Sequence, residues 1–103
     1  MSNNSRRVTE ASGGVLTVLQ ALSDPMRLEI VRQLAGCGAP GEMTCGRIEI
    51  PVTKGTATHH FKTLLSAGII DERQDGNRKW IRLRREELDE RYPGLIDLVL
   101  RGD

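Results

Sequence analysis

The pattern of apolar and polar positions is most regular over residues 53–68, which begin with Thr53 and end with Gly68. A threonine oxygen can cap the first turn of a helix, and a glycine readily takes the left-handed conformation that ends one. With about 100° between successive residues, such a helix has two distinct faces. One arc contains Ala57, His60, Phe61 and Leu64, and the opposite arc contains Gly55, His59, Lys62 and Ser66. The pattern therefore predicts one buried face and one small, polar and basic face.

The segments on either side of this helix complete a known arrangement. Residues 41–50 fit one short helix, and Pro51 leaves only a tight turn before the next helix begins. Residues 69–74 and 78–83 fit two short strands, and the turn 75–77 between them, Asp-Gly-Asn, is rich in residues that accept positive φ. Helix, turn, helix and hairpin predict a winged helix-turn-helix, a mainly α fold with a small β-hairpin wing.

Simple alternation divides the second strand of the hairpin into two sets. Ile81 and Leu83 point to one side, and Arg78, Trp80 and Arg82 point to the other. The indole of Trp80 could form a stacking platform for nucleic acid, or it could be covered by the stems of neighbouring arginines at the base of the wing. The sequence leaves both arrangements open.

Two helices are expected before the helix-turn-helix. Apolar residues recur at helical spacing over residues 8–22, but the glycines at 13 and 14 weaken the middle, so a helix is predicted over 14–22. The next helix runs over 25–35, with Asp24 as the capping side chain. Arg27 falls inside its apolar arc. Its stem could lie on the core with the charged head in water, or its head could form an ion pair or contact a DNA phosphate.

The C-terminal residues predict two further helical segments, 84–92 and 95–100, separated by Pro93 and Gly94. Their apolar stripe is longer than a domain of this size can cover, so we expect pairing with the helix over 14–22 across a two-fold axis. The residues expected at that dimer interface are Val15, Leu19, Leu88, Tyr92, Leu95, Ile96 and Val99. The acidic residues in the same region would repel an anionic membrane surface.

The length of 103 residues predicts one domain over 8–103, preceded by a polar, disordered tail over 1–7. No apolar run approaches the length of a membrane span, and no signal peptide is recognisable, so a cytoplasmic protein is expected. The net charge of +1 hides an uneven distribution, because residues 53–85 contain eight basic and three acidic side chains. Residues 53–67 contain no carboxylate at all. This basic surface predicts a polyanion as the partner.

The predicted partner is double-stranded DNA with a partly palindromic site. The residues expected to face the major groove are Lys54, Thr56, Thr58, His59 and Lys62, and those expected on the flanking backbone are Asn77, Arg78 and Lys79. His60 lies at the edge of the buried arc, where we expect a hydrogen-bonded structural histidine.

Two segments carry a family resemblance. Residues 22–31, LSDPMRLEIV, and residues 58–70, THHFKTLLSAGII, closely resemble the corresponding helices of the arsenical-resistance (ArsR/SmtB-type) repressors, and the similarity covers roughly residues 15–85. The resemblance implies a dimeric, operator-binding repressor that an inducer releases. It also implies that Thr53 caps the recognition helix, that Thr58 and His60 occupy the family's Ser and His positions, and that Arg78 and Lys79 lie in the wing.

The resemblance does not extend to the metal-sensing members of that family. Some of these members carry a Cys-Val-Cys box in the helix before the recognition helix, whereas residues 42–47, EMTCGR, contain one cysteine. Other members place histidine and carboxylate ligands on the last helix, whereas residues 86–103 contain no histidine. A thiophilic metal needs three or four converging ligands. We therefore expect that the protein binds no metal and no cofactor. If an inducer exists, we expect it to be a small molecule other than a metal ion. No nucleophile with a nearby base and no phosphate-binding loop is recognisable, so an enzyme is not expected.

Two other functions remain in competition. The winged helix could serve as a protein-interaction or dimerisation module, although the outer face of the 53–68 helix is polar and basic rather than apolar. The chain could also be a thiol-based, redox-responsive repressor that acts through Cys37 or Cys45, with Arg47 as the one basic neighbour that could lower a thiol pKa.

Overall fold

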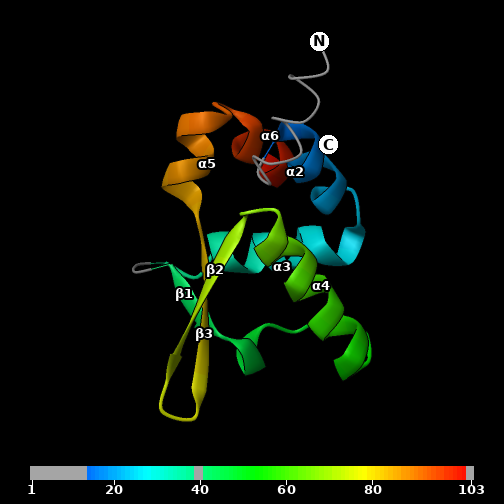
Figure 1. Ribbon diagram of the computed structural model, residues 1–103, viewed down its shortest axis with the longest axis vertical. Coiled ribbons are helices and arrows are strands. Elements are labelled where there is room, and N and C mark those ends of the chain that lie inside the picture. The colour runs from blue at the N-terminus through cyan, green and yellow to red at the C-terminus, as the bar shows by residue number, and fades with distance from the viewer. Residues whose placement is uncertain (1–13, 39–40, 102–103) are drawn as a thin grey trace, which may run out of the picture.

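The computed structural model describes residues 14–38 and 41–101. In chain order its elements are α2 (Val15–Leu22), α3 (Pro25–Ala35), β1 (Glu42–Thr44), the 3₁₀ turn η1 (Cys45–Arg47), α4 (Lys54–Ser66), β2 (Ile70–Asp75), β3 (Arg78–Leu83), α5 (Arg85–Arg91) and α6 (Leu95–Arg101). The molecule is elongated, 45 × 26 × 24 Å, with the β2–β3 hairpin at one end and α2, α5 and α6 at the other (Figure 1). The predicted mainly α fold with a β wing is confirmed. The predicted tail over 1–7 lies outside the described residues.

The helix boundaries follow the predicted capping signals. Asp24 accepts hydrogen bonds from the backbone N–H of Met26 (2.8 Å) and of Arg27 (3.2 Å), so α3 begins at Pro25. Thr53 accepts a hydrogen bond from the backbone N–H of Thr56 at 3.2 Å and caps α4. Gly68 has a φ of 77° just beyond the end of α4, where a residue with a side chain would be strained. The capping residues therefore predicted the start of α3 and both ends of α4 correctly.

The helix predicted over 41–50 is wrong. Glu42–Thr44 form a strand that pairs antiparallel with β3, and only Cys45–Arg47 make a single 3₁₀ turn. A helix there would place Gly46 in its interior, which costs about 1 kcal/mol relative to alanine. Pairing with β3 instead gives the backbone of 42–44 hydrogen bonds and sets Met43 opposite the fully buried Ile81. Tertiary pairing therefore overrides the weak helical pattern.

The sheet has three strands in the order β1-β3-β2, with β3 in the centre. Ile70 lies opposite Leu83 at the base of the hairpin, and both are buried together with Ile81. The other face of the sheet carries polar pairs, of which Asp71 opposite Arg82 is one. The turn at Gly76 and Asn77, with φ of 63° at Gly76, closes the hairpin as predicted. One face of the sheet thus completes the core and the other faces solvent.

Helix α3 is the centre of the fold, since it contacts α2, α4, α6 and β3. Three of its side chains, Ile30, Val31 and Leu34, are almost completely buried, as predicted for most of this helix. Figure 1 shows α4 on one side of α3, with the terminal helices above and the wing below. The core therefore holds α4 and the wing in a fixed relation.

Replacement of Asp24 with alanine is expected to destabilise the protein by about 1 kcal/mol at neutral pH, because two backbone N–H groups lose their acceptor. Burial raises the pKa of Asp24, but the hydrogen bonds from the backbone of Arg27 and Met26 and the nearby charge of Arg27 outweigh it, so the pKa lies below its usual range. The ionised carboxylate therefore stabilises the fold above the unfolded-state pKa of about 4, and this contribution disappears as pH falls through the folded-state pKa. Urea unfolding between pH 2 and 7 measures both effects. Asp24→Asn, which keeps a cap without charge, should lose the part of the pH dependence that Asp24 contributes and retain most of the stability.

Candidate nucleic-acid interface

Helix α4 presents the two faces that its sequence predicts. His60, Phe61 and Leu64 are buried against the core. The side chains exposed to solvent are those of Lys54, Thr56, Thr58, His59, Lys62 and Ser66. The structure thus places all five residues predicted for the major groove on the exposed surface of one helix. Because that surface carries Lys54 and Lys62 and contains no carboxylate, it attracts anions.

The threonine hydroxyls of α4 differ in what they leave available. Thr53 donates to the hydroxyl oxygen of Thr56 at 2.9 Å, so the hydrogen of Thr56 is free for an outside acceptor. Thr58 donates to the carbonyl oxygen of Lys54 at 3.0 Å, and Thr63 donates to that of His59 at 3.1 Å. A hydroxyl that donates to its own helix can still accept a hydrogen bond. Thr56 is therefore the threonine of this face best placed to donate to a phosphate or a base.

A polar cluster fixes α4 to the two helices before it. His60 is 7% exposed, and its Nδ1 lies 3.1 Å from Nη1 of Arg27. Since a guanidinium can only donate, Nδ1 is the acceptor and the ring hydrogen lies on Nε2, 4.0 Å from the carboxylate of Asp24. Nε of Arg27 donates to the carbonyl oxygen of Ala21 at 2.6 Å. The expectation of a hydrogen-bonded structural histidine is confirmed, and Arg27 has its head bound within the fold rather than in water.

The wing carries its predicted residues at the tip, where Asn77, Arg78 and Lys79 are all exposed. Lys79 lies 3.5 Å from Glu72, whereas Arg78 forms no ion pair within residues 14–38 and 41–101. At the base of the wing Arg73 lies over the Trp80 ring, 5.4 Å from its centroid, and makes two hydrogen bonds to Glu42, at 2.9 and 3.0 Å. The indole face is thus covered by an arginine, which is the second of the two arrangements considered for Trp80.

Ion pairing separates the basic residues into two groups. Arg82, Arg84 and Arg85, at the junction of the wing with the terminal helices, pair with carboxylates. In the part of the chain that the structure describes, the basic residues of η1, α4 and the wing tip that form no ion pair are Arg47, Lys54, Lys62 and Arg78. An uncompensated cation retains its full attraction for a polyanion. Four unpaired cations therefore lie on α4, η1 and the wing tip, while Arg27, Arg91 and Arg101 on other helices also form no ion pair among the described residues.

Arg47 was not predicted as a contact residue. It is exposed on η1 and, with Thr44, Cys45 and Gly46, faces the wing residues Asn77, Arg78 and Lys79 across an open groove of about 520 Å³. The helix assumed over 41–50 obscured this position, because the groove depends on η1 lying beside the wing. Gly46 could have indicated that residues 41–50 do not form a helix, because glycine is unfavourable in a helix interior.

The terminal helices leave apolar side chains uncovered. Leu16 is 60% and Leu98 64% exposed, and Val15 and Leu19 are nearly half exposed. Two residues predicted for the dimer interface, Leu88 and Ile96, are instead 3% and 0% exposed, because the chain's own core covers them. They have no surface to offer a second copy. The predicted residues Tyr92, Leu95 and Val99 are partly buried against the core. The sequence did not single out Leu16 and Leu98, which are the most exposed large apolar side chains of the described residues.

The thiols and other metal ligands are dispersed. Cys37 and Cys45 are free and partly buried, and the Cys37 thiol donates to the carbonyl oxygen of Leu34 at 3.1 Å. No group of three or more His, Cys, Asp or Glu side chains able to hold a metal ion occurs among the described residues. Within the same residues, no helix is long and apolar enough to cross a membrane.

Comparison with known proteins agrees with this geometry. A model of the helix-turn-helix domain family matches residues 22–73. The chain is 37% identical over 84 residues to YceK, an HTH-type transcriptional regulator of Bacillus subtilis, with 80% of this chain and 82% of YceK covered. It is 36% identical over 75 residues to the arsenical resistance operon repressor of Staphylococcus aureus, covering 72% of this chain and 69% of the repressor. The chain belongs to the ArsR family of winged helix-turn-helix regulators.

The fold of this ArsR-family chain also matches solved structures. Reduced HlyU from Vibrio cholerae superimposes with a TM-score of 0.67 over 94% of each chain, at 18% sequence identity. The ArsR-family relationship makes the protein a DNA-binding transcriptional regulator, and such regulators are not enzymes. Within this domain, α4 is the helix whose exposed face carries basic and hydroxyl side chains and no carboxylate.

Proposed function

We propose that this ArsR-family protein is a homodimeric repressor that binds a partly palindromic operator and is released by a non-metal inducer. The observation that carries the proposal is the exposed face of α4, which has basic and hydroxyl side chains and no carboxylate. Lys54, Thr56, Thr58, His59 and Lys62 would enter the major groove, and Asn77, Arg78 and Lys79 would contact the flanking backbone. The unpaired Arg47 extends the backbone contact beside the wing. A regulator of DNA acts where the DNA is, so we also propose a cytoplasmic location.

The exposed leucines support a two-fold assembly through the terminal helices. Leu16 and Leu98 are the most exposed large apolar side chains of the described residues, and both lie on helices at the end of the molecule away from the wing (Figure 1). A second copy that covers them would leave both recognition helices free. In such a dimer the helices should lie about 34–36 Å apart, one turn of DNA.

A non-metal inducer agrees with the side chains present. The cysteine at position 45 is the sole thiol of η1, and the described residues bring no three metal ligands together. Neither Cys37 nor Cys45 lies in the polar cluster that holds α4, so a thiol mechanism would have to act through another contact. The interaction-module alternative lacks an apolar outer face on α4.

Selection from random and genomic duplex fragments at near-physiological salt tests the proposal. The expected result is enrichment of a partly palindromic sequence whose half-sites are one helical turn apart. Retention of fragments without sequence preference, or with a single unrepeated half-site, would contradict the homodimeric operator model.

Lys62→Ala is expected to weaken binding to all duplexes by a similar factor and to lower the salt dependence. Each lost phosphate contact reduces the slope of log K against log salt by about 0.9, so a dimer that loses two contacts should show a decrease of about 1.8. Arg101→Ala, which removes the same charge from the exposed end of α6, is the matched control. Titration of labelled operator at several salt concentrations measures the slope, and equal slopes for the two variants would exclude Lys62 from the phosphate contacts.

A further inference from the structure

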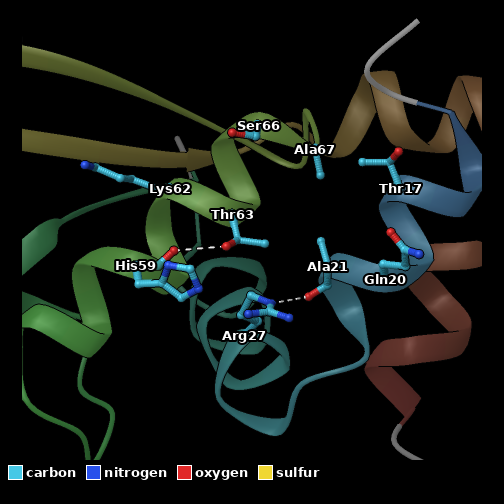
Figure 2. Close-up of a pocket in the computed structure, with 9 residues that line it drawn as sticks. All are labelled: Thr17, Gln20, Ala21, Arg27, His59, Lys62, Thr63, Ser66 and Ala67. Atoms are coloured by element: carbon cyan, nitrogen blue, oxygen red, sulfur yellow. Dashed lines mark hydrogen bonds between the residues drawn. The ribbon is translucent and has the colours of Figure 1, made fainter. Parts of the chain in front are cut away.

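A groove of about 430 Å³ lies between α2, the start of α3, and α4. Figure 2 shows its lining, with the α2 residues on one side, the α4 residues on the other and Arg27 between the two helices. The lining residues are Thr17, Gln20, Ala21, Arg27, His59, Lys62, Thr63, Ser66 and Ala67. Three separate elements of the fold therefore contribute side chains to one concave surface.

The described residues that line this groove offer hydrogen-bond donors and positive charge but no carboxylate. Arg27, Lys62 and His59 supply cations or N–H groups, and the hydroxyls of Thr17 and Ser66 and the amide of Gln20 supply further donors. None of the described residues that line the groove is an Asp or Glu. A surface groove with several donors, two permanent cations and no carboxylate favours an anion.

The guanidinium of Arg27 is already oriented for such a ligand. Nε donates to the carbonyl oxygen of Ala21 at 2.6 Å, and Nη1 donates to Nδ1 of His60 at 3.1 Å. Nη2 makes no hydrogen bond to any residue within 14–38 and 41–101. Because two bonds already fix the planar group, little rotamer entropy remains to be lost when the free edge donates to a phosphate.

We propose that this groove binds a phosphate group, with Arg27 as the anchoring residue, Lys62 as the second cation, and Gln20 and Thr17 of α2 as additional donors. Two sources can supply that group. One is the backbone of the bound DNA, because His59 and Lys62 belong to both the groove and the recognition face of α4. The other is a small phosphate-bearing molecule, which would compete with DNA for the same two side chains and would thus act as the inducer.

Gln20→Glu is the diagnostic variant. Gln20 is exposed, its side chain forms no hydrogen bond to the described residues, and glutamate is as good a helix former as glutamine. The substitution puts a negative charge into the groove without touching the α4 residues assigned to DNA. Ala35→Glu is the matched control, since it adds the same charge near the C-terminal end of α3, at an exposed position outside the groove. Arg27 itself is avoided as a test because its loss would also disturb the anchoring of α4.

Two measurements on the full chain decide between the outcomes. NMR titration with inorganic phosphate should shift the signals of residues 17–21, Arg27 and 59–66, and Gln20→Glu should weaken that binding about fivefold or more relative to Ala35→Glu. Operator titration over a range of salt then identifies the source. If the added carboxylate of Gln20→Glu displaces a DNA phosphate from Arg27, the salt slope should fall by about 0.9 for each such contact, which indicates the DNA backbone. Unchanged DNA binding with weakened phosphate binding indicates a small phosphate compound.

The proposal is overturned if Gln20→Glu and Ala35→Glu agree in both titrations, or if inorganic phosphate shifts signals only outside the groove and the salt slopes agree. The DNA half of the test rests on the proposed function, but the phosphate titration does not. Failure to select an operator would therefore leave the phosphate result interpretable, and an operator could be found even if the groove binds nothing.

Discussion

Leu16→Glu is expected to convert the proposed homodimer to a monomer without unfolding the chain. Burial of a whole leucine side chain is worth about 1.5–3 kcal/mol, so covering the 60% of Leu16 that is exposed is worth roughly 1–2 kcal/mol in each copy. Two copies lose about 2–4 kcal/mol together, which raises the dimer dissociation constant about 30- to 1000-fold. The cost of removing two carboxylates from water adds to this loss.

The substitution suits the local structure of the monomer. Leu16 lies in the first turn of α2, which contains no acidic residue, and a glutamate there interacts favourably with the helix dipole. Sedimentation velocity at micromolar protein measures the effect, and Leu98→Glu should behave in the same way. Leu16→Met preserves the apolar volume and should remain dimeric. If Leu16→Glu sediments like the unaltered protein, the exposed leucines are not the interface, and a monomeric unaltered protein would contradict the homodimer itself.

His60→Ala is expected to lower the free energy of unfolding by about 2–4 kcal/mol. The change removes a side chain that is 7% exposed and leaves Nη1 of Arg27 without its acceptor. The lost contact joins α4 to α3, so the recognition helix loses part of its attachment to the scaffold as well as its packing. Urea unfolding at a fixed protein concentration measures the difference, because dimer stability depends on concentration.

Two comparisons separate the hydrogen bond from the packing. The side-chain oxygen of an asparagine can come near the position that Nδ1 of the histidine occupies, so His60→Asn should retain the Arg27 bond and lose less stability than His60→Ala. A double-mutant cycle with Arg27→Met should give a coupling energy of about 0.5–3 kcal/mol between the two side chains. Additive effects would show that the 3.1 Å contact contributes nothing and that the loss arises from packing alone.

The parts of the fold that were predicted correctly are those whose signals lie within one element. Thr53 caps α4 through an N–H three residues later, and the buried and exposed faces of that helix follow from its own periodicity. The same holds for Asp24 and α3. Each of these features is decided by interactions within about one helical turn, which the order of the residues makes visible.

The parts that were missed depend on residues distant in the chain. Glu42 becomes part of a strand because Arg82 lies opposite it, 40 positions later, and three residues are too few to show an alternating pattern. Arg27 finds His60 as its partner 33 positions away. The stripe that contains Leu88 and Ile96 was recognised as apolar, but periodicity alone does not show whether the chain's own core or another copy covers a stripe. Distant pairing also explains why Arg47 was overlooked.

The covering of Trp80 by Arg73 gives this protein an internal optical reporter. Trp80 is the one tryptophan in the sequence, and it lies at the base of the wing under the guanidinium that reaches across to Glu42 on β1. Any movement of β2 relative to β1 changes the charge and the water around the indole, which governs its emission wavelength and intensity. The motion of the wing can therefore be followed in real time by intrinsic fluorescence, with no added label and no background from other indoles.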